Sequence, residues 1–147
     1  MPHSICKTLP ALALLASLEL HAGALENKQL VLDFAQQAFG EKQVRQAFER
    51  YVDSGYIQHN PHAPDGAEPA IQFLEGFQQQ FPQFRYAIKR VASEADLVFL
   101  HVHGTTSASD RGVAIVDIFR VADGKIVEHW DVIQPMPETA VSTHPLF

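Results

Sequence analysis

Cysteine is nearly absent from this sequence: among its 147 residues the single cysteine is Cys6, close to the N-terminus. A lone thiol cannot form an intrachain disulfide, and removal of an N-terminal segment that contains it leaves no thiol at all. Disulfide frameworks, thiolate catalysis and cysteine-ligated metals are therefore not expected in the body of the chain.

Positive charge is also scarce. The chain has 11 Lys and Arg residues against 17 Asp and Glu residues, which gives a formal net charge of -6 at pH 7. It has no basic run that could follow a phosphate backbone or an anionic membrane surface. It also lacks a phosphate-binding glycine-rich loop, a dinucleotide fingerprint and a nucleophile elbow. We expect neither a nucleic-acid partner nor a nucleotide cofactor.

An apolar run, Thr8–Leu18, follows Lys7 near the N-terminus. It is too short to span a bilayer but is typical of the core of a secretory signal, and Ala22, Gly23 and Ala24 offer small residues for cleavage. We predict a signal peptide at 1–24 and a single domain at 25–147, periplasmic or secreted, with no membrane contact after cleavage. The alternative is that the N-terminal segment stays attached as a helix.

Three segments have the periodicity of amphipathic helices. The first two are 27–39 and 42–51, and the third follows an N-cap at Asp65 and continues to about Phe81. The polar, proline-rich segment 56–66 between the second and third helices predicts a loop.

From residue 83 onward the apolar period changes to two, which is typical of strands. The strand-like segments are 84–88, 96–104, 112–121 and 125–134, and Asp123-Gly124 is a strong hairpin signal. Helices followed by an antiparallel meander predict an α+β fold. We expect the tail at 138–147 to be poorly ordered or to pack on a partner.

Asp117 is the principal candidate for function because it lies in the otherwise apolar run 113–119. Burial of an unpaired ionised group is costly, so such a residue is usually paired, protonated or functional. His101 and His103 share one face of the preceding strand, and we expect them to be its partners. One interpretation is a general acid/base that removes a proton alpha to a carbonyl; the other is a buried Asp–His hydrogen bond that fixes strand register.

The hairpin limits what can lie beside Asp117. If Asp123-Gly124 is the whole loop, Asp117 lies opposite Trp130; if Gly124 forms a bulge after a type I turn, it lies opposite His129. We therefore expect His129, Trp130 and Phe119 to contact a substrate bound near Asp117; the alternative for Trp130 is a place in the plain core.

The polar loop before the third helix offers further candidates. Tyr56, His59 and Asn60 could close the mouth of a pocket, because loops between helices often do so, or they could belong to a solvated turn.

A metal site is the main competing hypothesis. His101 and His103 near a carboxylate, or His59 and His62, could supply nitrogen and oxygen ligands. Neither spacing is specific, and the prediction is that no metal is bound.

Three stretches resemble the SnoaL-like polyketide cyclase family of the nuclear-transport-factor-two-like superfamily. They are Tyr56–Pro61, the His-Val-His-Gly strand at 101–104, and the segment from Asp117 to Asp131. The resemblance covers nearly all of the chain after residue 24, and the last stretch is its most specific part.

The resemblance implies a cone-shaped α+β fold, in which a strongly curved antiparallel sheet wraps around three helices and encloses a deep pocket. It implies cofactor-free aldol-type ring closure, with Asp117 in the acid/base position, His103 in the position of the assisting histidine and His101 in the polar position before it. His59 and Asn60 would lie near the pocket mouth.

The fold also supports isomerases, dehydratases and binding proteins. We therefore expect acid/base chemistry on a hydrophobic carbonyl compound, by cyclisation, isomerisation or dehydration. The alternatives are a pocket that only binds a small molecule and a His/Asp metal-binding variant. The resemblance further implies a homodimer.

Overall fold

The computed structural model describes the backbone of residues 11–147 and the side chains from residue 23 onward. The first ten residues of the expected signal, Cys6 among them, lie outside the described residues. In the described part of the chain, no helix is both long and apolar enough to cross a membrane.

Helix α1 (Ala11–Ala35) continues into a short π-helical turn, η1 (Gln36–Gly40), and is followed by α2 (Val44–Tyr51). α2 forms where helical periodicity predicts it, whereas α1 begins at Ala11, well before the predicted start at residue 27. The apolar side chains of α2 and of the described part of α1 gather on one buried face. The buried residues of these elements are Val31, Phe34, Ala35, Ala38, Val44, Ala47 and Phe48. Helix α3 (Ala67–Gln80) buries Ala70 and Ile71.

Strand β1 (Val52–Gln58) ends inside the segment 56–66, for which the sequence predicts a loop. The loop prediction is therefore wrong for residues 56–58. β1 pairs in parallel with β5 (Lys125–Pro135) at the edge of the sheet, and the backbone N–H of His59 extends the pairing by donating to the carbonyl of His129 at 2.9 Å. This pairing joins segments far apart in sequence. β1 is therefore stabilised as a strand by its pairing with β5, and not by an alternation of apolar and polar residues along its own sequence.

The remaining strands are β2 (Arg85–Glu94), β3 (Leu97–Thr105) and β4 (Val113–Ala122), and with β5 they form the predicted antiparallel meander. The complete sheet has five strands in the order β1-β5-β4-β3-β2 and is mixed, because β1 runs parallel to its neighbour.

The β4–β5 hairpin contains a bulge that neither predicted register includes. Asp123 and Gly124 have φ values of 50° and 71° and form the whole loop, as in a type I′ turn. Val121 pairs with Ile126 but Arg120 pairs with Glu128, so β5 carries one extra residue at Val127. As a result Asp117 lies opposite Asp131, and the prediction that Trp130 or His129 is directly opposite Asp117 is wrong.

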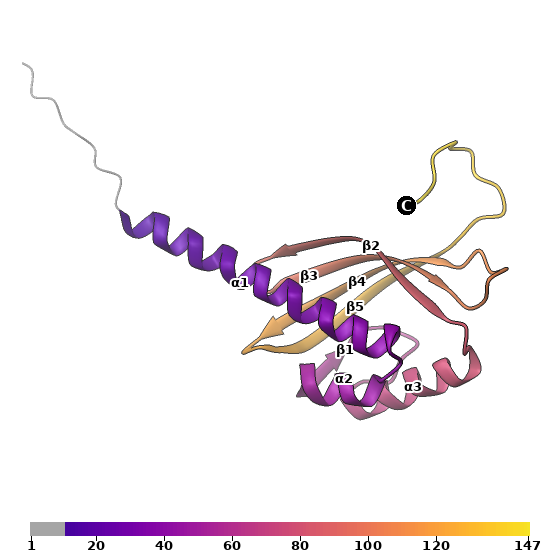
Figure 1. Ribbon diagram of the computed structural model, residues 1–147, viewed down its shortest axis with the longest axis horizontal. Helices are drawn as coiled ribbons and strands as arrows, with labels where there is room; N and C mark the ends of the chain where they lie inside the picture. The colour runs from indigo at the N-terminus through magenta and orange to yellow at the C-terminus, as the bar shows by residue number, and fades with distance from the viewer. Residues whose placement is uncertain (1–10) are drawn as a thin grey trace, which may run out of the picture.

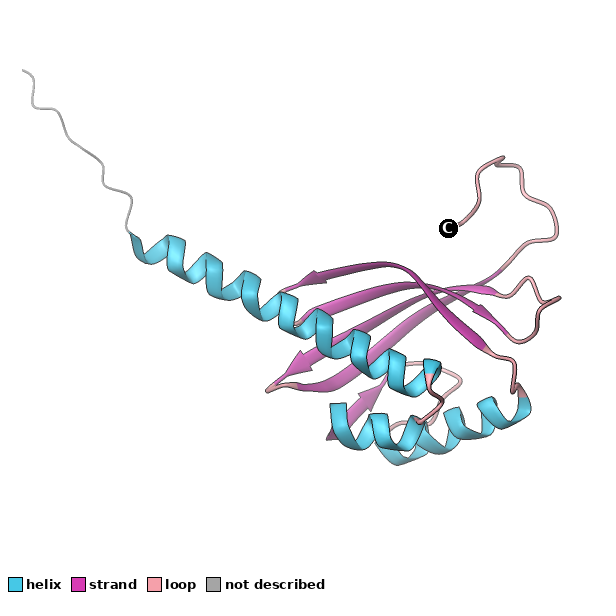
Figure 2. Cartoon of the chain, in the orientation of Figure 1, coloured by secondary structure: helices cyan, strands magenta, loops and turns pink. Residues whose placement is uncertain are grey.

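The curved sheet presents one face to the helices and the other away from them (Figures 1 and 2). α1 packs along β2 and β3, and α3 lies against β1. On β3 the residues that face the helices are Val98, Leu100 and Val102, each with 0% exposure. The α+β class with three helices against a strongly curved sheet is confirmed.

The C-terminal tail returns to the outer face of the sheet, which is the face turned away from the helices. The ring centroid of Phe147 lies 5.0 Å from that of His101 and 4.7 Å from that of His103. The ammonium of Lys89 lies 5.5 Å from the same phenyl ring. The last residue therefore packs on the chain's own β3.

Candidate functional site

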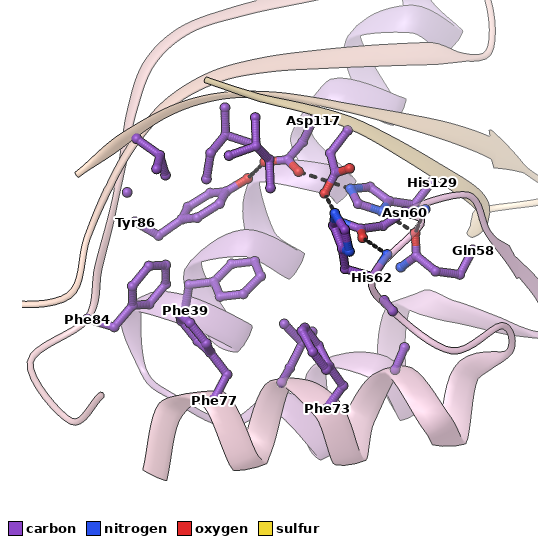
Figure 3. A pocket seen from close by; sticks show the side chains of 18 of the residues that line it. Phe39, Gln58, Asn60, His62, Phe73, Phe77, Phe84, Tyr86, Asp117 and His129 are labelled. Carbon is purple, nitrogen blue, oxygen red and sulfur yellow. Dashed lines mark hydrogen bonds and ion pairs between the residues drawn. The ribbon is translucent and has the colours of Figure 1, made fainter. Parts of the chain in front are cut away.

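A cavity of about 430 Å³ lies between the inner face of the sheet and the helices. Figure 3 shows that the aromatic rings of Phe39, Phe73, Phe77 and Phe84 form its helix side and one end. Polar side chains line the opposite side, where strands β4 and β5 and the segment after β1 meet. The cavity is thus a mostly apolar space with one polar wall, as in many small-molecule sites.

Asp117 lies in the middle of the polar wall and is only 6% exposed. The hydroxyl of Tyr86 donates to its Oδ2 at 2.5 Å, and Nε2 of His129 lies 3.0 Å from its Oδ1. These two contacts, drawn in Figure 3, fix both oxygens of the carboxylate toward the cavity. The burial of Asp117 is therefore compensated by Tyr86, which the sequence did not single out, and by His129.

The expected contact between the β3 histidines and Asp117 is wrong. Leu100 is the residue opposite Asp117, so His101 and His103 project from the outer face of the sheet. His103 Nε2 donates to the carbonyl of Arg111 at 2.8 Å, and His101 Nδ1 lies 3.2 Å from a guanidinium nitrogen of Arg90. Neither histidine lines the cavity.

The tautomer of His129 follows from its partners. Gln58 Oε1 accepts the backbone N–H of Asn60 at 2.9 Å, which identifies this atom of the amide as the oxygen. His129 Nδ1 lies 2.9 Å from the same oxygen and must carry a proton. One further proton then lies between Nε2 and Asp117 Oδ1: the pair is either imidazolium with carboxylate or neutral imidazole with carboxylic acid.

Asp131 brings a second carboxylate into the cavity wall. It lies opposite Asp117, and Asn60 Nδ2 donates to its Oδ2 at 2.5 Å. The sequence does not single out Asp131, although Asp131 lies two residues after His129 and therefore on the same face of β5. Asn60, which the sequence predicts near the mouth of a pocket, lines the cavity.

Asp117, His129 and Asp131 each offer a potential ligand atom, and these atoms lie within 4.8 Å of one another. An imidazole nitrogen and two carboxylate oxygens are ligands that suit zinc or manganese. Neither of the two histidine pairs considered from the sequence belongs to such a group in the described part of the chain. His62 lines the cavity, but the ring of His59 stacks elsewhere on Trp130.

Two phenols complete the polar wall. Tyr56 is 6% exposed, and its burial, together with the charges of Asp117 and Asp131, raises its pKa above the usual range of tyrosine. Burial and the adjacent carboxylate of Asp117 likewise raise the pKa of Tyr86. Both hydroxyls therefore remain protonated and can act as hydrogen-bond donors near neutral pH.

Two of the residues expected to contact substrate lie outside the cavity wall. The rings of His59 and Trp130 stack on each other with centroids 4.7 Å apart, and His59 Nε2 lies 2.6 Å from Glu128 Oε1. The bulge in β5 is the cause, because it turns Trp130 to the outer face. Phe119, in contrast, lines the cavity beside His129, with ring centroids 4.8 Å apart.

With this geometry established, comparison with known proteins identifies the family. The model of the SnoaL-like polyketide cyclase family matches residues 29–139. The chain belongs to the SnoaL-like polyketide cyclase family. Its match includes every strand and the helical segments that enclose the cavity.

Solved structures share the SnoaL-like fold. A candidate SnoaL-like polyketide cyclase from Jannaschia sp. CCS1 is 22% identical with a TM-score of 0.64, and the match covers 76% of this chain and 87% of that one. AclR from Streptomyces galilaeus, a candidate hydroxylase, is 22% identical with a TM-score of 0.63 and coverages of 76% and 90%.

Bal32a, from a soil-derived mobile gene cassette, is 16% identical, with a TM-score of 0.64 and coverages of 76% and 91%. No curated protein sequence matches the chain. At these identities the structures support the common SnoaL-like fold and do not specify a reaction.

Proposed function

We propose that this SnoaL-like protein is a small enzyme of the lyase or isomerase type that performs acid–base chemistry on a hydrophobic carbonyl compound. One observation carries the proposal: the carboxylate of Asp117 is buried in an aromatic cavity, and His129 and Tyr86 hold its two oxygens. A fixed carboxylate in an apolar site is suited to proton transfer at carbon.

Asp117 is the proton acceptor in this proposal. The C–H bond alpha to the carbonyl breaks, the proton moves to a carboxylate oxygen of Asp117, and the electron pair passes to the carbonyl oxygen as an enolate. The carboxyl group then returns the proton to another carbon for isomerisation, to the new alkoxide after carbon–carbon bond formation, or to a departing hydroxyl for dehydration. General acid–base catalysis of this kind contributes about a hundred- to ten-thousandfold in rate.

His129 and Tyr86 support Asp117 in different ways. In the ionised state of the pair, the imidazolium of His129 stabilises the carboxylate at 3.0 Å, and its Nδ1–H remains bound to Gln58. Tyr86 stays neutral and orients the second oxygen. The proton-transfer group is therefore oriented before a substrate enters.

The cavity suggests the size and character of the substrate. Its volume of about 430 Å³ is within the range of small-molecule sites, and the aromatic rings of its helix side favour a flat apolar body.

The test is exchange of alpha protons for deuterium, because exchange requires only the first step and no knowledge of the natural substrate. Wild type and Asp117→Asn are incubated in D₂O with flat aryl ketones such as 2-acetylnaphthalene, and deuterium is followed by mass spectrometry. We expect exchange with wild type alone, with both proteins giving the same circular dichroism. Equal exchange by a folded Asp117→Asn protein contradicts the assignment.

A second candidate function is ligand binding without chemistry. It is favoured by the fact that both oxygens of Asp117 already accept hydrogen bonds. Native mass spectrometry of the purified protein distinguishes the two: a retained and chemically unaltered ligand supports binding, and a retained zinc or manganese ion supports a metal-binding variant.

We further propose that the protein is exported with residues 1–24 as its signal and that it forms a homodimer through the outer face of the sheet. Support for the dimer comes from Val116 and Val132, which are opposite each other on that face and are 36% and 63% exposed. N-terminal sequencing of exported protein tests the signal. Light scattering of Val132→Lys against wild type tests the interface, and a monomeric wild type contradicts it.

A further inference from the structure

The charge of the cavity wall limits what it can bind. Its side chains include three carboxylates, Asp110, Asp117 and Asp131, and the described lining residues include no lysine or arginine. The two histidines of the wall can offset at most two of these charges; His129 is in contact with Asp117, and His62 lies in the exposed segment after β1. A carboxylate or phosphate in this apolar space would meet uncompensated negative charge, so the cavity favours an uncharged ligand.

An uncharged carbonyl compound needs a hydrogen-bond donor for its oxygen, and most donors of the wall are already used. Tyr86 donates to Asp117, the hydroxyl of Thr106 donates to Asp110, and both nitrogens of His129 have partners. Gln58 and Asn60 each have one further N–H bond, and the ring of His62 can also donate, but these three side chains are more exposed than Tyr56, which is 6% exposed.

The hydroxyl of Tyr56 differs from these groups. Its oxygen accepts a hydrogen bond from Nε2 of Gln58 at 2.9 Å, and no described residue accepts the proton of Tyr56. The orientation of Gln58 is fixed by Asn60 and His129, so Gln58 cannot reverse its amide and accept instead. An O–H group that receives a hydrogen bond is a stronger donor.

Tyr56 is also suitably positioned. Its side chain lines the cavity, its ring packs edge-on against Phe48 with centroids 5.9 Å apart, and the charges of Asp117 and Asp131 act on its hydroxyl. The donor and the two carboxylates therefore belong to the same polar wall.

We propose that the Tyr56 hydroxyl binds the carbonyl oxygen of an uncharged, flat ligand in this cavity. The catalytic part of the inference rests on the proposed function: Tyr56 polarises the carbonyl and stabilises the enolate oxygen while Asp117 removes the alpha proton. The binding part is independent of turnover.

The direct test is the infrared carbonyl frequency of bound 2-acetylnaphthalene labelled with ¹³C at the carbonyl. We expect a lower frequency in wild type than in Tyr56→Phe, because a donated hydrogen bond weakens the C=O bond. Tyr86→Phe is the matched control: it removes the other buried hydroxyl, which is committed to Asp117, and should retain the wild-type frequency. Equal frequencies in wild type and Tyr56→Phe overturn the proposal.

A test on the ligand side needs no protein variant. In wild type, 2-ethylnaphthalene lacks the acceptor and should bind about two- to tenfold more weakly than 2-acetylnaphthalene, the usual range for one neutral hydrogen bond. The anion 2-naphthoate should bind at least about tenfold more weakly, because its charge is uncompensated. Failure of the ketone to bind up to its solubility limit, or equal binding of the three compounds, overturns the proposal.

Turnover separates this inference from the proposed function. In the deuterium-exchange assay, Tyr56→Phe should lose about a hundred- to a thousandfold in kcat, the cost of one oxyanion-stabilising donor, with the ketone affinity lowered about tenfold at most. Asp117→Asn should lose exchange but keep the wild-type carbonyl frequency. If the carbonyl frequency differs between wild type and Tyr56→Phe but wild type shows no exchange, the enzyme proposal fails and Tyr56 remains the carbonyl-binding residue. Full exchange by Tyr56→Phe overturns the catalytic role of Tyr56.

Discussion

Replacement of Gln58 by leucine should disconnect His129 from the residues that set its tautomer. The Gln58 amide oxygen accepts from both His129 Nδ1 and the backbone of Asn60, so the leucine variant leaves two donors without that acceptor. The Asn60 backbone is half-buried and can turn to water, whereas the side chain of His129 is only 12% exposed. We therefore count one buried unsatisfied donor and expect a loss of about 1–3 kcal/mol in the free energy of unfolding.

The assay combines urea denaturation with ¹⁵N NMR of the histidine side chains. Wild type should show a His129 ring protonated at Nδ1, and Gln58→Leu should lose this preference and most of the exchange activity. Gln58→Glu is the matched control, because a carboxylate keeps an acceptor for Nδ1–H and should retain the tautomer. A wild-type ring protonated only at Nε2, or a leucine variant as stable as wild type, refutes the reasoning.

Three other expectations follow from the structure. The pKa values of Tyr56 and Tyr86 are raised in the folded state, so the unfolded chain loses these two protons at a lower pH. The free energy of unfolding should therefore fall as pH rises above about 10. A free energy of unfolding that does not change with pH in this range contradicts the expectation. Gly112→Ala would place a Cβ against the backbone oxygen of Gly104 at φ +76° and should destabilise by roughly 1–3 kcal/mol. Gly76→Ala, with open space in α3, should stabilise by about 0.5–1 kcal/mol in thermal melts. His103→Gln should leave deuterium exchange within about twofold of wild type, and loss of exchange would restore the histidine role implied by the family resemblance.

The helices and the class of fold could be predicted from the sequence because their signals are local. Apolar side chains at helical spacing suffice for α2, and the two-residue Asp123-Gly124 signal suffices for the β4–β5 turn. β1 could not be predicted in this way, because its partner strand lies far along the chain and supplies the ladder that makes it a strand.

The candidate site was predicted in part. Asp117 was identified by a carboxylate in an apolar run, a signal that needs no knowledge of its neighbours. The neighbours depend on register across strands, and a shift of one residue reverses the face of every side chain. The sequence therefore does not reveal that His103 lies on the outer face, or that Asp131 lies opposite Asp117.

The bulge at Val127 means that the chemistry of the cavity depends on the number of residues in β5 as well as on their identity. Insertion of one residue beside Val127, with the one-residue bulge kept, would place Glu128 opposite Phe119 and Trp130 opposite Asp117, so that these two side chains replace His129 and Asp131 at the inner face. A single-codon insertion would thus convert an imidazole–carboxylate wall into one containing an indole, with no substitution in any other strand. Insertion within β5 therefore offers this scaffold a direct route between different ligand chemistries.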